Sequence, residues 1–188
     1  GVGLDIYCAA LSREMQWRLL YGIEQHPWNT EMRRRTQHYG SCGIPGADGL
    51  PEWCAELLAE IYQRQWIPIC LNEVLVWEFL PGQGFAPLLE NHEQYGEHLV
   101  LIHLGVPLEM CFIHKNKAAP RNVFAYFAAA GTVTVICNQA RSEWCRYIAK
   151  QQYEDMIENR EQLRGKHILL TLRYRRSDVR TQSHGRRR

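Results

Sequence analysis

Apolar residues repeat at helical spacing in the first third of the chain and at strand spacing after residue 73. Ser12 is a suitable helix N-cap, because its hydroxyl can accept a hydrogen bond from a first-turn backbone N–H. Downstream of it, four apolar residues share one helical face: Met15, Leu19, Leu20 and Ile23. We predict a helix from Ser12 to about Gln25, ended by Pro27, because the residue before a proline avoids helical backbone angles.

A second apolar stripe begins after Pro51, a residue that fits the first turn of a helix. Its members recur in pairs four residues apart: Trp53, Cys54, Leu57, Leu58, Ile61 and Tyr62. We interpret this stripe as core rather than as a binding groove. The chain therefore carries two predicted N-terminal helices, each with one buried face.

Short segments rich in β-branched and aromatic residues follow, separated by Gly, Pro or Asn. Five of them precede residue 138: Val74–Phe79, His98–Leu104, Glu109–His114, Asn122–Phe127 and Thr132–Cys137. His167–Arg173 predicts a closing strand. Between the two groups, residues 148–163 mix charged and apolar residues, and we predict a helix with a solvated face there.

Length and composition indicate one domain. A chain of 188 residues with 46% hydrophobic residues can bury a full core, and no apolar run is long enough to span a bilayer. We place the domain at residues 1–173 and a polar, basic tail at residues 174–188. The first residue is Gly rather than Met, so we expect a trimmed boundary or a removed segment, such as a targeting peptide.

The cysteines and the charge distribution indicate the kind of compartment and the kind of partner to expect. The seven cysteines include no Cys-x-x-Cys pair, which disfavours a zinc ribbon or a secreted disulfide framework and favours a reducing, intracellular compartment. The segment from Arg164 to the last residue contains nine Lys/Arg residues and one acidic residue, which gives it a net charge of +8. The rest of the chain has a net charge of −6. Such a basic end is typical of polyanion binding. The expected RNA- or partner-binding residues are Arg173, Arg175, Arg176, Arg180, Arg186, Arg187 and Arg188.

The segment from Val76 to His92 carries the most specific pattern in the sequence. Pro81 and Gly82 predict a turn after a strand, and Gly84 interrupts the chain again two residues later. This segment resembles the AlkB-like family of iron(II)- and 2-oxoglutarate-dependent dioxygenases. That family has Asn-x-Tyr-x-Pro-Gly-x-Gly-Ile-x-x-His-x-Asp here. Pro81, Gly82, Gly84 and the apolar Phe85 align with this pattern without a gap.

Further matches to the family occur in the same order along the chain. They are Arg33–Gly40, Leu104-Gly105, Gly131–Cys137, Ala140–Trp144 and His167–Arg173. The resemblance implies a double-stranded β-helix (a cupin-like jelly roll), mainly β, with the two N-terminal helices packed on one sheet. It also favours a scaffold role for the basic triplet that begins at Arg33, over direct nucleic-acid contact.

The residues that would bind iron in the family are replaced here. Leu88 stands where the resemblance places the first His ligand, Glu90 where it places the Asp, and Arg146 where it places the second His. A non-haem iron site needs two imidazoles and a carboxylate on one face. We therefore expect no metal site. We also predict that Arg146 reaches into the site and neutralises Glu90.

The residues that would hold 2-oxoglutarate are also changed. Trp77 and Phe79 replace the Asn and Tyr of the family, and His167 replaces the first of its two closing arginines. Arg173 matches the second, and we expect it to form a salt bridge with Glu90 or another acid. Trp77 has the bulk to fill the co-substrate position, so no cofactor and no small-molecule substrate are expected.

A preserved scaffold, altered site residues and a basic tail lead to our main functional hypothesis. We expect a non-catalytic AlkB-like protein that acts as a structural or RNA-binding subunit of a larger assembly, specifically a mitochondrial ribosome or RNA-processing complex. One alternative is an active dioxygenase with non-standard ligands drawn from Glu90, His92, His98 and His103. Another is a protein–protein adaptor whose tail binds an acidic partner.

Overall fold

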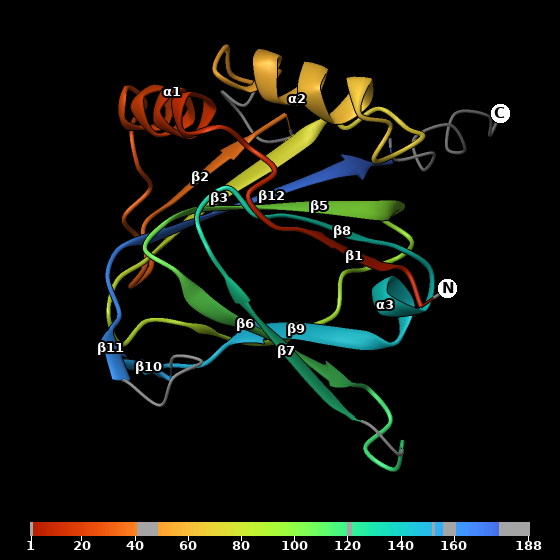
Figure 1. Cartoon of the computed structure of the whole chain (residues 1–188). Helices are drawn as coiled ribbons and strands as arrows, with labels where there is room; N and C mark the ends of the chain where they lie inside the picture. Colours follow the sequence, from red (N-terminus) through yellow and green to blue (C-terminus); the bar gives the residue numbers. More distant parts are fainter. Residues whose placement is uncertain (1, 41–48, 120–121, 152, 156–160, 177–188) are drawn as a thin grey trace, which may run out of the picture.

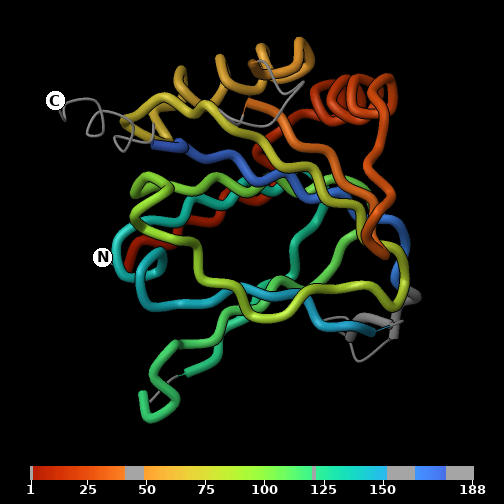
Figure 2. The backbone as a smooth tube through the Cα atoms, turned by 180° about the vertical axis from the view of Figure 1, so that it is seen from behind, coloured from red at the N-terminus to blue at the C-terminus, as the bar shows by residue number. Residues whose placement is uncertain are grey.

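Two antiparallel sheets face each other, and two helices cover the outer side of the larger sheet (Figure 1). The computed structural model describes residues 2–40, 49–119, 122–151, 153–155 and 161–176. Seen from behind, the backbone closes around an interior between the two sheets (Figure 2). This arrangement is a double-stranded β-helix, as the sequence predicted.

The larger sheet has six strands in the order β1-β8-β5-β12-β3-β2. Their bounds are Leu4–Tyr7, Val133–Ile136, Tyr95–Gly105, His167–Arg175, Glu73–Phe79 and Thr36–Tyr39. The closing strand β12 lies between β5 and β3, so the end of the domain pairs with strands from its middle. In this register, His167 lies opposite Phe79 and Arg173 lies opposite Glu73.

The smaller sheet has four strands in the order β4-β9-β6-β7. Their bounds are Phe85–Leu88, Trp144–Ile148, Leu108–His114 and Val123–Ala128. A short helix, α3 (Asn138–Ser142), connects β8 of the larger sheet to β9 of the smaller sheet. Leu88 lies directly opposite Arg146 in the β4–β9 pair, so two of the altered positions meet across one ladder.

Helices α1 (Arg13–Glu24) and α2 (Cys54–Gln63) pack on the outer face of the six-stranded sheet (Figure 1). The Ser12 hydroxyl accepts a hydrogen bond from the Met15 amide at 3.1 Å, which confirms the predicted N-cap. The predicted apolar stripes supply the fully buried contacts of both helices: Leu19, Ile23, Cys54, Leu57 and Ile61. Both N-terminal helices are thereby confirmed.

The glycines of the Pro-Gly-x-Gly segment allow β4 to lie beside β9. Gly82 has a φ of +83°, which an L side chain rarely adopts. A Cβ added to Gly84 would lie 2.2 Å from the Ile148 carbonyl oxygen, so only glycine fits without displacing β9. The motif therefore fixes the backbone that brings Leu88 and Glu90 into the interior.

The prediction of a helix at residues 148–163 is wrong for the residues described there. Strand β9 ends at Ile148, and a two-stranded antiparallel hairpin follows, formed by β10 (Tyr153–Asp155) and β11 (Glu161–Leu163). Ala149, Tyr153 and Ile157 recur at helical spacing in the sequence, so periodicity alone gave the wrong element here. Helix α3 and strand β9 were not predicted as elements.

No described helix is long and apolar enough to cross a membrane.

Candidate functional site

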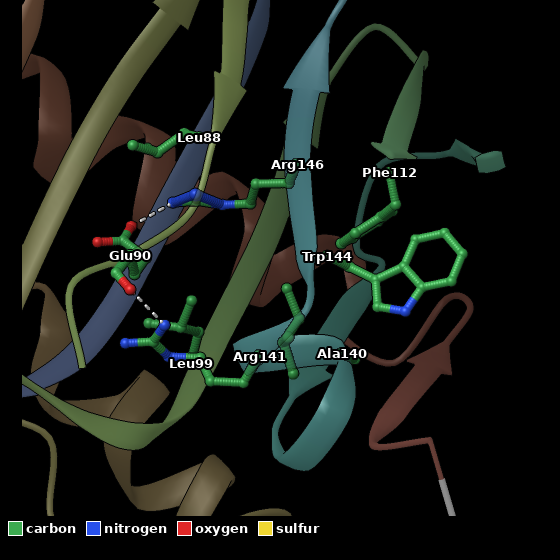
Figure 3. A pocket seen from close by; sticks show the side chains of 9 residues that line it. Leu88, Glu90, Leu99, Phe112, Ala140, Arg141, Trp144 and Arg146 are labelled. Carbon is green, nitrogen blue, oxygen red and sulfur yellow. Dashed lines mark hydrogen bonds and ion pairs between the residues drawn. The ribbon is translucent and has the colours of Figure 1, made fainter. Parts of the chain in front are cut away.

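The Glu90 carboxylate lies at the centre of a buried group of arginines between the two sheets (Figure 3). Arg146 on β9 donates from Nη2 to Glu90 Oε1 at 2.8 Å. Arg173 on β12 donates from Nη1 to Glu90 Oε2 at 2.7 Å. Their side chains are only 3–8% exposed, so both ion pairs are shielded from water. The predicted pairing of Arg146 with Glu90 is confirmed, as is the salt bridge of Arg173.

Two further contacts extend this group on either side. Arg141, from α3, donates from Nη1 to the Glu90 backbone carbonyl at 2.9 Å. On the other side, Arg173 Nε donates to Glu73, whose second oxygen lies 2.8 Å from His38 Nε2. Burial alone would raise the pKa of Glu73, but the hydrogen bonds from His38 and Arg173 outweigh it and hold that pKa at about 2.

These residues do not fit an iron ion. Leu88 presents only hydrocarbon, Arg146 brings a cation to the position of the second imidazole, and both oxygens of Glu90 accept bonds from guanidinium groups. Among the described residues, no three His, Cys, Asp or Glu side chains converge as metal ligands. The alternative ligand set is not brought together either, since the buried His103 on β5 is hydrogen-bonded elsewhere.

Aromatic side chains occupy the two positions, Trp77 and Phe79, at which the resemblance implies co-substrate binding residues. The rings of Trp77 and Phe85 lie 5.2 Å apart, edge to face, and Phe79 packs against both of them. The Arg34 guanidinium lies 4.4 Å from the centroid of Trp77, on the outer side of this cluster. An amide and a phenol that could bind a carboxylate are thus replaced by rings packed on one another.

His167 belongs to a buried chain of hydrogen bonds that the sequence analysis did not predict. Its Nδ1 lies 2.7 Å from the Val106 carbonyl oxygen, which can only accept, so Nδ1 carries the proton. His167 Nε2 therefore accepts from His103 Nδ1 at 3.1 Å, and His103 Nε2 in turn accepts from the Tyr126 hydroxyl at 3.0 Å. Tyr126 accepts from Thr134 at 2.7 Å, so every proton in the chain has one allowed position.

The predicted surface role of the C-terminal arginines is wrong for Arg173, because its guanidinium is buried and paired with Glu73 and Glu90. Arg175 is partly buried and lies 3.4 Å from Glu73, whereas the more exposed Arg176 lies 3.8 Å from Glu97. The other four predicted residues lie outside the described part of the chain: Arg180, Arg186, Arg187 and Arg188.

Comparison with known proteins places this geometry in context. No protein-family model matches the chain. The structure superposes on that of OsALKBH1 with a TM-score of 0.67 and 12% identity, covering 91% of this chain and 97% of the other. It also resembles an oxidoreductase of the 2OG-Fe(II) oxygenase family from Burkholderia pseudomallei, with a TM-score of 0.62, 15% identity, and 94% and 86% coverage. The fold is that of the 2-oxoglutarate- and iron(II)-dependent oxygenases.

Sequence similarity supports the AlkB-like resemblance in particular. The chain is 23% identical over 171 residues to the tRNA (carboxymethyluridine(34)-5-O)-methyltransferase alkbh8 of Xenopus tropicalis, covering 81% of this chain and 26% of the relative. It is 24% identical over 162 residues to the uncharacterized protein L905 of Acanthamoeba polyphaga mimivirus, covering 82% and 76%. The chain thus spans about a quarter of the length of the methyltransferase relative.

Replacement of Glu90 by Gln should destabilise the fold strongly. The variant leaves Arg146 buried without a counter-ion and leaves Arg173 with Glu73 alone, and a buried charge that loses its partner typically costs about 3–5 kcal/mol. Urea unfolding followed by tryptophan fluorescence measures the change, and Glu56→Gln, on an exposed pair with Arg18, should cost less than about 1 kcal/mol. Adding Arg146→Met to Glu90→Gln should restore part of the loss; equal stability of Glu90→Gln and wild type would contradict the assigned pairing.

The histidine chain should make stability depend on pH in mildly acidic solution. Burial lowers the pKa of both His103 and His167, the latter to about 4, from an ordinary value near 6.5. The unfolded state therefore binds more protons below pH 6.5, so the free energy of unfolding should fall as pH falls from 6.5 towards 4. The slope limit is about 1.4 kcal/mol per pH unit for each histidine.

Urea unfolding between pH 7 and 4.5 tests this dependence. Replacing His167 by Gln, which can also donate and accept, should flatten the profile. Identical profiles for the wild type and His167→Gln would show that this histidine does not contribute.

Proposed function

We propose that this protein is a non-catalytic AlkB-like protein that serves as an RNA-binding, structural subunit of a larger ribonucleoprotein assembly. The observation that carries the first part is the Arg146–Glu90–Arg173 ion-pair group. It occupies the positions where a member of this fold family would bind iron, and it uses both oxygens of the carboxylate. Oxygen chemistry at this place would need open coordination positions, which these side chains do not supply.

The RNA-binding part of the proposal draws on a basic cleft at the edge of the domain. The cleft has a volume of about 340 Å³ and is lined by residues from three separate segments: Met32, Arg33, Arg34, Gly82, Gln83, Gly84 and Lys150. Arg33 and Lys150 are exposed and form no ion pair with any described residue. Such point charges can neutralise RNA phosphates without reading the sequence.

The three arginines of the Arg33–Arg35 triplet have different surroundings. Arg35 is committed to the scaffold, with bonds of 2.8 Å to Glu78 and 3.2 Å to Glu24. Arg34 stacks on Trp77 and donates to the Gly84 carbonyl at 3.2 Å, so it forms the inner wall of the cleft. Arg33 alone extends to solvent. The scaffold interpretation therefore holds for Arg35, and we assign RNA contact to Arg33.

The relatives support nucleic acid as the partner class. Two matched proteins, from Xenopus tropicalis and Mus musculus, are named as tRNA methyltransferases. Because the chain matches only about a quarter of their length, we carry over RNA as a partner and not methyl transfer. A mitochondrial location and the tail contacts remain predictions.

The first experiment tests the absence of catalysis. The purified protein is loaded anaerobically with iron(II) or manganese(II), its bound metal is measured by elemental analysis, and 2-oxoglutarate is titrated by calorimetry. We expect no stoichiometric metal and no heat of 2-oxoglutarate binding. One metal ion per chain together with 2-oxoglutarate binding would overturn the proposal in favour of an active dioxygenase with unusual ligands.

The second experiment tests the RNA interface. Single-stranded RNA binding is measured against salt concentration for the wild type and for Arg33→Gln/Lys150→Gln. The variant should bind more weakly, and the slope of log K against log salt should fall by about one for each lost phosphate contact.

A matched control separates the cleft from general charge loss. Arg13→Gln/Lys117→Gln removes the same charge from exposed positions outside the cleft, so it should retain the wild-type slope. Equal losses in both variants would contradict a specific cleft. Absence of RNA binding by the wild type would favour the protein–protein adaptor.

A further inference from the structure

Strand β7 is the outermost strand of the four-stranded sheet. The sheet order ends at β7, which pairs only with β6 among the described strands. Its sequence, Val-Phe-Ala-Tyr-Phe-Ala, contains no charged residue and no proline, and its register with β6 has no bulge. Natural edge strands usually carry such protective features, because an unprotected edge pairs with other chains. Their absence from β7 indicates an edge that a further strand covers.

The direction of each backbone group at this edge follows from the ladder with β6. In an antiparallel pair, opposite residues alternate between those that exchange backbone hydrogen bonds and those that do not. The amide of His114 donates to the Asn122 carbonyl at 2.8 Å, so this pair is of the bonded kind. Every second residue from Asn122 along β7 therefore directs its N–H and C=O to β6. The N–H and C=O groups of the residues between them, Val123, Ala125 and Phe127, point outward.

The side chains at this edge present apolar surface to solvent. Val123 is 55% exposed and Phe124 is 41% exposed. Both also line an apolar groove of about 440 Å³ that reaches Leu4 and Ile6 on β1, the edge strand of the six-stranded sheet (Figure 1). The apolar surface thus continues from the edge of one sheet to the edge of the other. Contiguous exposed apolar surface of this kind is typical of protein association sites.

We propose that β7 pairs with β7 of a second copy of this chain, antiparallel and about a two-fold axis at Ala125. This axis places Ala125 opposite itself and Val123 opposite Phe127 of the other copy. Each outward N–H and C=O of these three residues then has a partner, so the two edges form six backbone hydrogen bonds. A two-fold axis at either neighbouring residue would pair only two of the three residues with each other.

The side chains of β7 are complementary to themselves in this register. On one face of the sheet, the β-branched Val123 lies opposite the aromatic Phe127 of the other copy. On the other face, Phe124 lies opposite Tyr126. Aromatic pairs and aromatic–β-branched pairs across antiparallel strands are stabilising. The small side chain of Ala125 avoids a clash at the axis, where each residue meets its own copy.

The charges around β7 are complementary across the same axis. Because β7 itself is uncharged, two copies bring no like charges opposite each other. Lys115 and Lys117 precede β7, whereas Glu109 on β6 lies opposite Phe127, near the other end of the strand. The antiparallel arrangement brings the basic end of each copy towards the acidic end of the other. A pair of this kind closes on itself, because both copies use the same surface.

Sedimentation velocity of the full chain across the micromolar concentration range tests the pairing. The wild type should show a reversible equilibrium between monomer and dimer. Ala125→Lys and Ala125→Glu should each raise the dissociation constant at least about tenfold, because the axis puts two like charges opposite each other. An equal mixture of these two variants should form a dimer again, because Lys then lies opposite Glu.

Two further variants separate dimer loss from unfolding, which circular dichroism monitors during heating. Ala59→Lys adds the same charge at an exposed position of α2, so it should keep the wild-type dissociation constant. Ala125→Pro removes an N–H that points away from β6, so it should separate the copies while each chain stays folded.

Two results would overturn the proposal. A wild-type chain that stays monomeric across the range would leave the edge to a strand of another protein. A wild-type dimer combined with a monomeric mixture of the Lys and Glu variants would place the contact elsewhere on the surface. These readouts do not involve RNA, so they are independent of the proposed function.

Discussion

The carboxylate of Glu90 joins the two sheets of the jelly roll through charge-assisted hydrogen bonds. Glu90 follows β4, Arg146 belongs to the four-stranded sheet, and Arg173 belongs to the six-stranded sheet. Arg141 fixes the backbone at the same point from α3. Because desolvation offsets much of the Coulombic attraction of a buried ion pair, its main effect is to make alternative arrangements costly. The hydrogen bonds of Glu90, Arg141, Arg146 and Arg173 form only when all four residues are in place. Because these residues come from both sheets and from α3, the bonds fix the position of one sheet relative to the other.

The rest of the interior is consistent with this constraint. Apolar side chains from both sheets form one core between them, and Trp77 and Phe85 extend that core towards the cleft at Arg34. Among the described residues, the arginine group and the histidine chain are two buried polar networks of this interior, and the histidine chain uses its donors and acceptors in a fixed order. Between Trp77, Phe79 and Phe85, the interior on this side is occupied by aromatic rings that pack on one another.

Sequence reasoning identified the architecture and the central ion pair for the same reason. The family resemblance placed Leu88, Glu90 and Arg146 at positions that meet in one site, and opposite charges at buried neighbouring positions pair. The contact of Arg141 was not predicted, because its motif gave a place in the fold and no partner. Tyr126 and Thr134 were missed because a hydrogen bond between distant strands leaves no periodic signal. The helix expected at residues 148–163 was wrong because a mix of charged and apolar residues fits a helix and a strand pair equally well.

The hydrogen-bond order around His167 also bears on how this protein can change over evolution. Substitution of His167 by arginine would place a donor where His103 Nδ1 now needs an acceptor, and it would add a cation to a buried position. Substitution of His103 alone would remove the donor to His167 Nε2 and the acceptor of the Tyr126 hydroxyl, which would keep only Thr134. Either replacement would leave a buried donor or acceptor without its present partner, so a second residue would have to change with it. The histidine pair therefore restricts which single substitutions this interior can accept.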